Sequence, residues 1–211
     1  MQHESRLQGR AASFRQRAVV HREVLRVVPQ TGPSTVGAIN IISGMTGNID
    51  QNNTASDVIS GSIVGDPDPA FDDCSGKDVV GMQPTNENIG TLFNARGITW
   101  GWFEGGFTPS GTSGTKSVCG NTTVRLDGTA VLAYVPHHEP FQYYTSTANP
   151  HHLAPKNVNE VGHDGQANHQ YDLAWFTKAA MNGKLPAVSY LKAPAAENAH
   201  PGNSSPLDEQ V

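Results

Sequence analysis

Two adjacent histidines, His137 and His138, are the first residues whose type and spacing point to chemistry. They follow an apolar segment, residues 131–135, which is compatible with a short buried strand or the end of a helix. A neutral imidazole can bind a metal ion, and an imidazolium can stabilise phosphate charge or protonate a leaving group. Pro136 and Pro140 restrict the backbone around the pair, and on an extended chain only one of two neighbouring side chains faces a given site. The alternative is that the two histidines are surface or packing residues without a chemical role.

Ser34 stands at the start of a predicted helix. The apolar run 36–42 follows Ser34 and Thr35 and ends near Gly44, a pattern typical of a short helix with a hydroxyl at its N-cap. The positive end of a helix and its unpaired N–H groups favour phosphate and other anions. The sequence therefore makes Ser34 a candidate for anion binding, with plain helix capping as the alternative.

A third group of polar residues follows the predicted strand 185–191. Lys192 lies at the end of this strand, and Glu197, Asn198 and His200 come shortly after it. Ligands of α/β proteins bind at the carboxyl ends of the sheet strands, so this position favours a functional role. Lys192 could pair with an anionic substrate or simply be solvated.

The elements that must position these residues alternate between helix and strand. This order predicts an α/β fold, with Trp100, Trp102 and Phe103 packing one strand into the core. The two intervening loops are unusually long for a compact domain, so we expect them to be functional or tied down. In chain order, the prediction is a helix at 33–44, a loop at 45–88, a helix at 88–97, a strand at 98–103, a loop at 104–130, a helix at 171–182 and a strand at 185–191.

The two cysteines, Cys74 and Cys119, fall one in each long loop. Two cysteines exclude a disulfide-dense scaffold and a four-cysteine zinc site. A disulfide between them would tie the two loops together and contribute roughly 3–4 kcal/mol by restricting the unfolded chain. Two unrelated thiols are the alternative.

Charge divides the chain into a basic head and an acidic body. Residues 1–26 contain six arginines and two acids, a net charge of +4, whereas residues 27–211 carry a net charge of −9. A nucleic-acid arm needs interleaved aromatic residues or a companion motif, and neither is present, so we expect no nucleic-acid partner. We favour a head of foreign origin, outside the fold, with a domain over residues 27–211. No apolar run approaches a membrane span, and the head has no apolar signal-peptide core.

Five ordered segments resemble the bacterial phosphoesterases that include secreted acid phosphatases and phospholipases C, in the alkaline phosphatase superfamily. The resemblance covers about residues 29–210, and residues 1–26 do not take part in it. It implies a partial three-layer α/β sandwich, with helices on both faces of an incomplete central sheet. The matching segments are residues 32–44, residues 88–107, residues 137–141, residues 185–202 and residues 205–210.

The same resemblance implies a mechanism and its residues. A hydroxyl nucleophile at a helix N-terminus, ligated to a divalent metal ion, attacks phosphorus and forms a covalent phospho-enzyme. The nucleophile falls at Ser34, which would also bind the metal, with Thr35 as the second choice. Val36 stands where the family usually has proline. His137, His138 and His200 fall where active-site histidines surround the phosphoryl group, and we expect Thr35, Asn40 and Lys192 to contact substrate.

Two metal-binding motifs implied by the resemblance have no counterpart in the 211 residues. One is a Glu-Asn motif on a strand before the nucleophile, and the other is a paired aspartate beyond Val211; Asp72 and Asp73 lie in a different context. We therefore expect little hydrolase activity from this chain alone, and a catalytically inactive remnant or binding protein is the alternative. The expected substrate is a phosphate monoester or a phospholipid, and the expected location is secreted or periplasmic.

Overall fold

The central sheet of the protein consists of three parallel strands in the order β10-β5-β11. The computed structural model describes residues 32–50, 53–200, 202, 204, 205, 207 and 208, so the basic segment 1–26 lies outside the described residues. The middle strand β5 covers Trp100–Glu104, and β10 (Gln170–Asp172) and β11 (Val188–Lys192) flank it. The predicted strand at 98–103 is confirmed, with its ends at Trp100 and Glu104. The predicted strand at 185–191 is confirmed as well, but it begins at Val188, because Pro186 lies before the residues that pair with β5.

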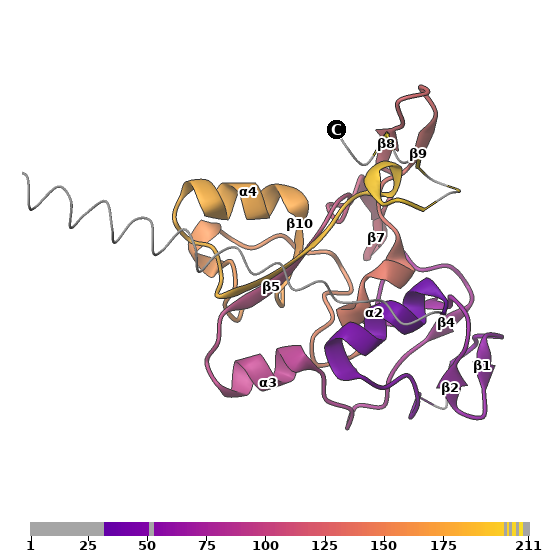
Figure 1. The fold of residues 1–211 in the computed structure, drawn as a ribbon. Coiled ribbons are helices and arrows are strands. Elements are labelled where there is room, and N and C mark those ends of the chain that lie inside the picture. The colour runs from indigo at the N-terminus through magenta and orange to yellow at the C-terminus, as the bar shows by residue number, and fades with distance from the viewer. Residues whose placement is uncertain (1–31, 51–52, 201, 203, 206, 209–211) are drawn as a thin grey trace, which may run out of the picture. The chain divides into compact units, whose positions relative to one another are not determined.

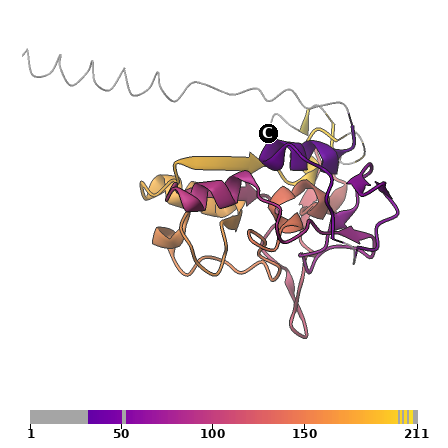
Figure 2. The same ribbon diagram turned by 90° about the horizontal axis from the view of Figure 1, so that it is seen from below.

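Helices cover both faces of this sheet. Side chains alternate along β5, so Trp100 and Trp102 enter one hydrophobic cluster together with residues of α2 and α3, whereas Phe103 enters a second cluster with residues of α4. Figure 1 shows α4 on one side of β5 and the pair α2 and α3 on the other. In the view from below, α3 lies in front of the sheet and α4 behind it (Figure 2). This layering confirms the predicted α/β sandwich and the core role of the two tryptophans and Phe103.

Each of the three α-helices in the described part of the chain lies where the sequence predicts one. Helix α2 covers Ser34–Ser43, α3 covers Ile89–Ala95 and α4 covers Leu173–Met181. Gly44 ends α2 with φ of 65°, a left-handed conformation that glycine adopts without steric cost. Helix α3 begins at an Asn88 capping box, and α4 begins after Asp172, whose side chain accepts a hydrogen bond from the N–H of Ala174 at 3.0 Å.

The long loops contain more structure than the sequence predicts. The segment between α2 and α3 forms two small sheets, β1-β2 and β3-β4, and the segment after β5 forms two hairpins, β6-β7 and β8-β9. The pairing strands are two or three residues long, too short for a hydrophobic pattern to reveal them. They are β1 (Val58–Ile59), β2 (Ser62–Ile63), β3 (Asp68–Pro69), β4 (Val79–Val80), β6 (Gly111–Ser113), β7 (Lys116–Val118), β8 (Thr122–Val124) and β9 (Ala130–Leu132).

Four short 3-10 helices complete the described elements. The first two, η1 (Pro136–His138) and η2 (Pro140–Tyr143), follow directly after β9 and contact the start of the fold at α2. The other two, η3 (Val158–Glu160) and η4 (Ala195–Glu197), precede β10 and follow β11 respectively. No helix in the described part of the chain is long and apolar enough to cross a membrane.

The disulfide predicted between Cys74 and Cys119 is present, with a Cα–Cα distance of 5.7 Å. It joins the segment between β3 and β4 to the segment between the two hairpins. The Cys74 N–H also donates a hydrogen bond to Asp72 Oδ1 at 2.8 Å, and the N–H of Ser117 donates to Asp73 Oδ2 at 2.9 Å. The long loops are therefore tied down covalently and by hydrogen bonds, as their length required.

Candidate active site

The start of α2 is capped from a distant loop rather than by its own hydroxyl. Pro33 occupies the N-cap and makes no side-chain cap, so Ser34 is the first helical residue and its prediction as the N-cap is wrong. Proline already has the extended φ and ψ that an N-cap needs, and the helix starts directly after it. The N–H of Thr35 donates instead to Asp66 Oδ1 at 2.9 Å. A carboxylate 31 residues away in the chain thus stabilises the positive end of this helix.

The hydroxyls of Ser34 and Thr35 have different surroundings. Thr35 is fully buried, and its Oγ1 lies 3.4 Å from the carbonyl oxygen of His137, 3.4 Å from the hydroxyl of Tyr143 and 3.5 Å from the carbonyl oxygen of Pro67. Ser34 is half-buried, and within the described part of the chain no hydrogen bond engages its hydroxyl. Thr35 therefore joins α2 to its neighbours, whereas the Ser34 hydroxyl stays available at the helix start.

His137 and His138 lie in the 3-10 helix η1, not on an extended segment. A 3-10 turn brings neighbouring side chains closer than a strand does, and the two imidazole rings lie 4.5 Å apart between centroids. The expectation that their side chains point apart is therefore wrong. Nδ1 of His137 lies 3.5 Å from Oδ1 of Asp68, so the loop that caps α2 also contacts the first histidine.

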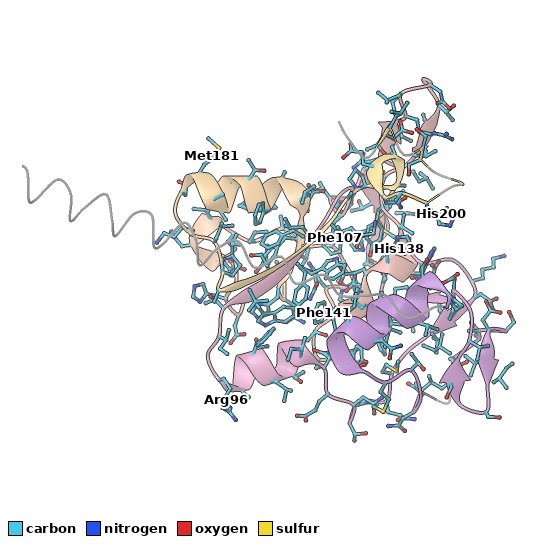
Figure 3. All side chains as sticks on the ribbon, viewed as in Figure 1. Arg96, Phe107, His138, Phe141, Met181 and His200 are labelled. Atoms are coloured by element: carbon cyan, nitrogen blue, oxygen red, sulfur yellow. A yellow bond between two sulfur atoms is a disulfide. The ribbon has the colours of Figure 1, made fainter. Side chains whose placement is uncertain are left out.

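His138 lies close enough to other predicted site residues for their charges to affect its pKa. The pKa of His138 is lowered to about 3, chiefly by burial and then by the nearby Lys192, His137 and His200, whose charges disfavour a positive charge on the ring. Figure 3 shows the side chains of His138 and His200 close to each other near the start of α2. The structure thus brings three of the predicted histidines and Lys192 into one region.

Two buried polar atoms in this region lack hydrogen-bond partners within the described chain. They are Nδ1 of His138 and Nδ2 of Asn198. Oδ1 of Asn198 accepts the N–H of His200 at 3.0 Å, so the Asn198 side chain is held with its amide nitrogen free. Buried donors without partners are rare and call for a ligand or ordered water. Both atoms are suited to hydrogen bonding with an oxygen-rich ligand.

Lys192 ends β11, in register with Glu104 at the end of β5. Its ammonium group donates to the carbonyl oxygen of Ala193 at 2.8 Å. Burial lowers the pKa of Lys192, and the negative charge of Glu104 opposes this shift. A partly buried ammonium at the carboxyl ends of parallel strands is suited to an anionic ligand.

Asn40 is the predicted site residue that the structure does not bring to this region. It lies six residues after Ser34 in α2, which is about 9 Å along the helix axis at about 1.5 Å per residue. Its carbonyl oxygen accepts the N–H of Gly44 at 3.0 Å, which closes the helix end. A contact between Asn40 and substrate stays a prediction.

Sequence reasoning missed a buried network beside the disulfide. Nε2 of His152 lies 2.8 Å from Oδ1 of Asp72, and both side chains are fully buried. Oδ2 of Asp72 accepts hydrogen bonds from the hydroxyl of Tyr134 and, at 3.1 Å, from the amide of Gln142. His151 and His152 form the second histidine pair of the sequence, yet only His152 is buried, where its ring stacks on Phe107. No local sequence signal distinguishes the two.

The described residues do not supply a complete site for a divalent metal ion. Among them, the one group of three His, Cys, Asp or Glu ligand atoms consists of Cys74, Cys119 and His152. The two sulfur atoms are joined in the disulfide, and a metal needs the thiolate. Around Ser34, the nearest carboxylates are already engaged, since Asp66 caps α2 and Asp68 contacts His137 and the N–H of Gly76.

Comparison with known proteins adds one finding. A family model described as "Phosphoesterase family" matches residues 27–211, which is most of the chain and includes every described residue. Among curated proteins, none matches the chain significantly. The matched region contains the α2 start, the η1 histidines and the end of β11.

Proposed function

Since the chain belongs to the phosphoesterase family, it is a hydrolase of phosphoric ester bonds, and we propose that the hydroxyl of Ser34 is its nucleophile. The supporting observation is the contrast between the two neighbouring hydroxyls at the start of α2. Thr35 uses its hydroxyl to join three elements, whereas that of Ser34 meets no partner in the described chain. A nucleophile must be free to approach phosphorus, so the contrast favours Ser34 over Thr35.

We propose that the phosphoryl group binds between the start of α2 and the three histidines His137, His138 and His200. The N–H groups at the start of α2 that Asp66 does not engage can donate to it, and Lys192 contributes a positive charge near His138. His138 is neutral near pH 7, because its pKa is lowered to about 3, so it serves as a hydrogen-bonding group rather than as an acid. Asn198 offers a second N–H donor. We assign proton transfer to His137 or His200.

The reaction on this site proceeds in two steps. Oγ of Ser34 bonds to phosphorus as the bond to the leaving oxygen breaks; the serine proton passes to a nearby base, and His137 or His200 gives a proton to the leaving oxygen. Water then attacks the phosphoserine, which releases the phosphate product and returns the hydroxyl to Ser34. Helix N–H groups and the side chains of Lys192 and His138 stabilise the charged oxygens in both steps.

In this proposal, Ser34 is the one described residue that would bind a divalent metal ion. The metal would lower the pKa of the serine hydroxyl and neutralise charge on the phosphoryl oxygens. Because the described residues do not complete its ligand set, no step above depends on it.

The substrate class that we propose is a phosphate monoester or a phospholipid, hydrolysed in the manner of an acid phosphatase or a phospholipase C. We propose that the segments between α2 and α3 and between β5 and η1 form the rim of the site and contact the leaving group. A secreted or periplasmic location is consistent with the disulfide, since disulfides persist in oxidising compartments.

A catalytically inactive remnant or phosphate-binding protein is the second candidate. It is favoured by the lack of a complete metal site among the described residues. The two candidates differ in one property, because both bind inorganic phosphate and only the enzyme transfers a phosphoryl group to Ser34.

The test is a phosphoryl-transfer experiment on the wild-type chain and on Ser34→Ala and Thr35→Val variants. Each protein is incubated with p-nitrophenyl phosphate or a phosphatidylcholine analogue and with Mg²⁺, Mn²⁺, Ca²⁺ or Zn²⁺, then quenched in acid. We expect a covalent adduct at Ser34 in wild type and in folded Thr35→Val, even where turnover is low, and none in Ser34→Ala. The adduct is a phosphate from p-nitrophenyl phosphate and a phosphocholine from the phosphatidylcholine analogue. Phosphate binding without transfer under every metal would support the binding protein instead.

A further inference from the structure

Two glutamate carboxyl groups meet inside the fold next to the proposed site. Glu104 ends β5 and is 1% exposed, and Glu139 directly follows His138 and is 0% exposed. The two carboxyl groups lie close enough to form a hydrogen bond when one of them is protonated, and this proximity adds to burial in raising the pKa of Glu139. Acidic residues are almost never fully buried unless they are paired, so this contact requires an explanation.

The oxygen atoms of this pair are satisfied only in part by the protein. Oε2 of Glu104 accepts the indole N–H of Trp102 at 3.0 Å, and Oε1 of Glu139 accepts the N–H of Phe141 at 3.3 Å. The backbone N–H of Val135 also interacts with the Glu104 carboxyl group. By hydrogen-bond geometry, Oε1 of Glu104 and Oε2 of Glu139 are buried without a partner among the described residues. Two ionised carboxylates offer only acceptors to each other, whereas one proton between them satisfies both.

The surroundings of the pair favour retention of that proton. Burial raises the pKa of Glu104 to about 7 and that of Glu139 well above its usual range. Asp72 adds negative charge near both, and the buried Tyr134 hydroxyl is directed to Asp72 rather than to either glutamate. Lys192 is the cation that faces Glu104 and opposes its shift.

We propose that Glu104 and Glu139 share one proton as a carboxylic acid–carboxylate pair, and that this pair positions His138 and Lys192 at the phosphoryl site. The positioning role rests on the proposed function. Glu104 fixes the carboxyl end of β5, and Glu139 starts η2 immediately after His138. The shared proton therefore links the sheet to the histidine turn, and the remaining single negative charge balances Lys192. Glu104 and Glu139 are positioning residues, because they act through these two neighbours.

The shared proton is tested by the pH dependence of unfolding, which needs no activity. The folded pKa of Glu104, about 7, lies above the value of 4.5 expected in the unfolded chain, so the stability it contributes is complete below pH 4.5 and is lost as pH rises to about 7. The neutral amide of a Glu104→Gln variant avoids this loss. We expect the free energy of unfolding of Glu104→Gln relative to wild type to rise across that window. The exposed Glu87→Gln is the control, and equal pH profiles for all three proteins would overturn the shared proton.

The positioning role is tested by the binding of inorganic phosphate, measured by calorimetry at pH 7. An amide at position 104 can still donate to Glu139, whereas leucine cannot, so we expect Glu104→Gln to bind within about threefold of wild type and Glu104→Leu about tenfold more weakly. Equal affinity for wild type and Glu104→Leu would overturn the positioning role. A wild-type chain that binds no phosphate would overturn both that role and the proposed function, and the pH profile would still decide whether the proton is shared. If Glu104→Leu does not fold, Glu139→Leu replaces it in the binding measurement, with the same loss of phosphate affinity expected and equal affinity again overturning the positioning role.

Discussion

The backbone N–H of Thr35 donates a hydrogen bond of 2.9 Å to Oδ1 of Asp66, across 31 residues of sequence. Two residues further on, Oδ1 of Asp68 lies 3.5 Å from Nδ1 of His137. One short loop thus holds the helix that presents Ser34 and the turn that presents the histidines. The relative position of Ser34, the proposed nucleophile, and the proposed phosphoryl-binding histidines depends on this loop.

Removal of the Asp66 cap should lower the stability of the fold. Asp66→Ala leaves the Thr35 N–H without its acceptor, and loss of a helix cap costs about 1 kcal/mol. Asp66→Asn keeps an acceptor oxygen and should stay within a few tenths of a kcal/mol of wild type. Urea unfolding measures the difference, and equal midpoints for the alanine and asparagine variants would show that the carboxylate does not cap α2.

The two histidines of the second pair should differ strongly in their effect on stability. His152→Ala removes the ring nitrogen that lies 2.8 Å from Oδ1 of the buried Asp72, and a buried polar group that loses a hydrogen-bond partner costs about 1–3 kcal/mol. His151→Ala breaks an exposed pair with Asp73, where we expect less than about 1 kcal/mol. Thermal unfolding of both variants checks this order, and comparable losses would contradict the buried network.

Reduction of the disulfide should destabilise the fold without unfolding the central sheet. Cys74 and Cys119 are separated by 45 residues, and closing a loop of that length contributes roughly 3–4 kcal/mol through the unfolded chain. We expect a Cys74→Ser, Cys119→Ser double variant to lose that amount in chemical unfolding, as does reduced wild type. Unchanged stability after complete reduction, confirmed by thiol counting, would contradict the prediction.

Acid should weaken the fold through His138. Its folded pKa, about 3, lies below the value of 6.5 expected in the unfolded chain, so its contribution to stability is complete above pH 6.5 and is lost as pH falls towards 3. His138→Gln has no such titration. The stability of wild type relative to His138→Gln should therefore fall between pH 6.5 and about 3, and a constant difference across this range would mean that His138 titrates normally.

The sequence predicts the elements with strong local signals and misses those that depend on distant contacts. The capping residue Asn88 and the stop at Gly97 locate α3, and the apolar β5 is evident in the same way. Strand β10 is missed because Gln170–Asp172 is short, polar and directly before a helix. Its identity as a strand comes from pairing with β5, which no local pattern reveals.

The candidate site also contains some residues that the local sequence reveals and others that only the folded structure reveals. Ser34 and the histidines stand out because hydroxyl and imidazole groups next to strand and helix ends are a recognisable pattern. The cap from Asp66 and the contact between Glu104 and Glu139 join residues far apart in the chain, within segments that look like ordinary loop and strand ends. Their roles follow from burial and hydrogen bonding, which only the folded chain defines.

The most direct test of the central claim is the site of phosphorylation in an acid-quenched reaction of the wild-type chain with p-nitrophenyl phosphate and a divalent metal ion, read by peptide mass spectrometry. The account predicts one phosphate on Ser34, absent from Ser34→Ala and present in folded Thr35→Val. Phosphate on Thr35 or on a histidine, or wild-type turnover by Ser34→Ala, would contradict it.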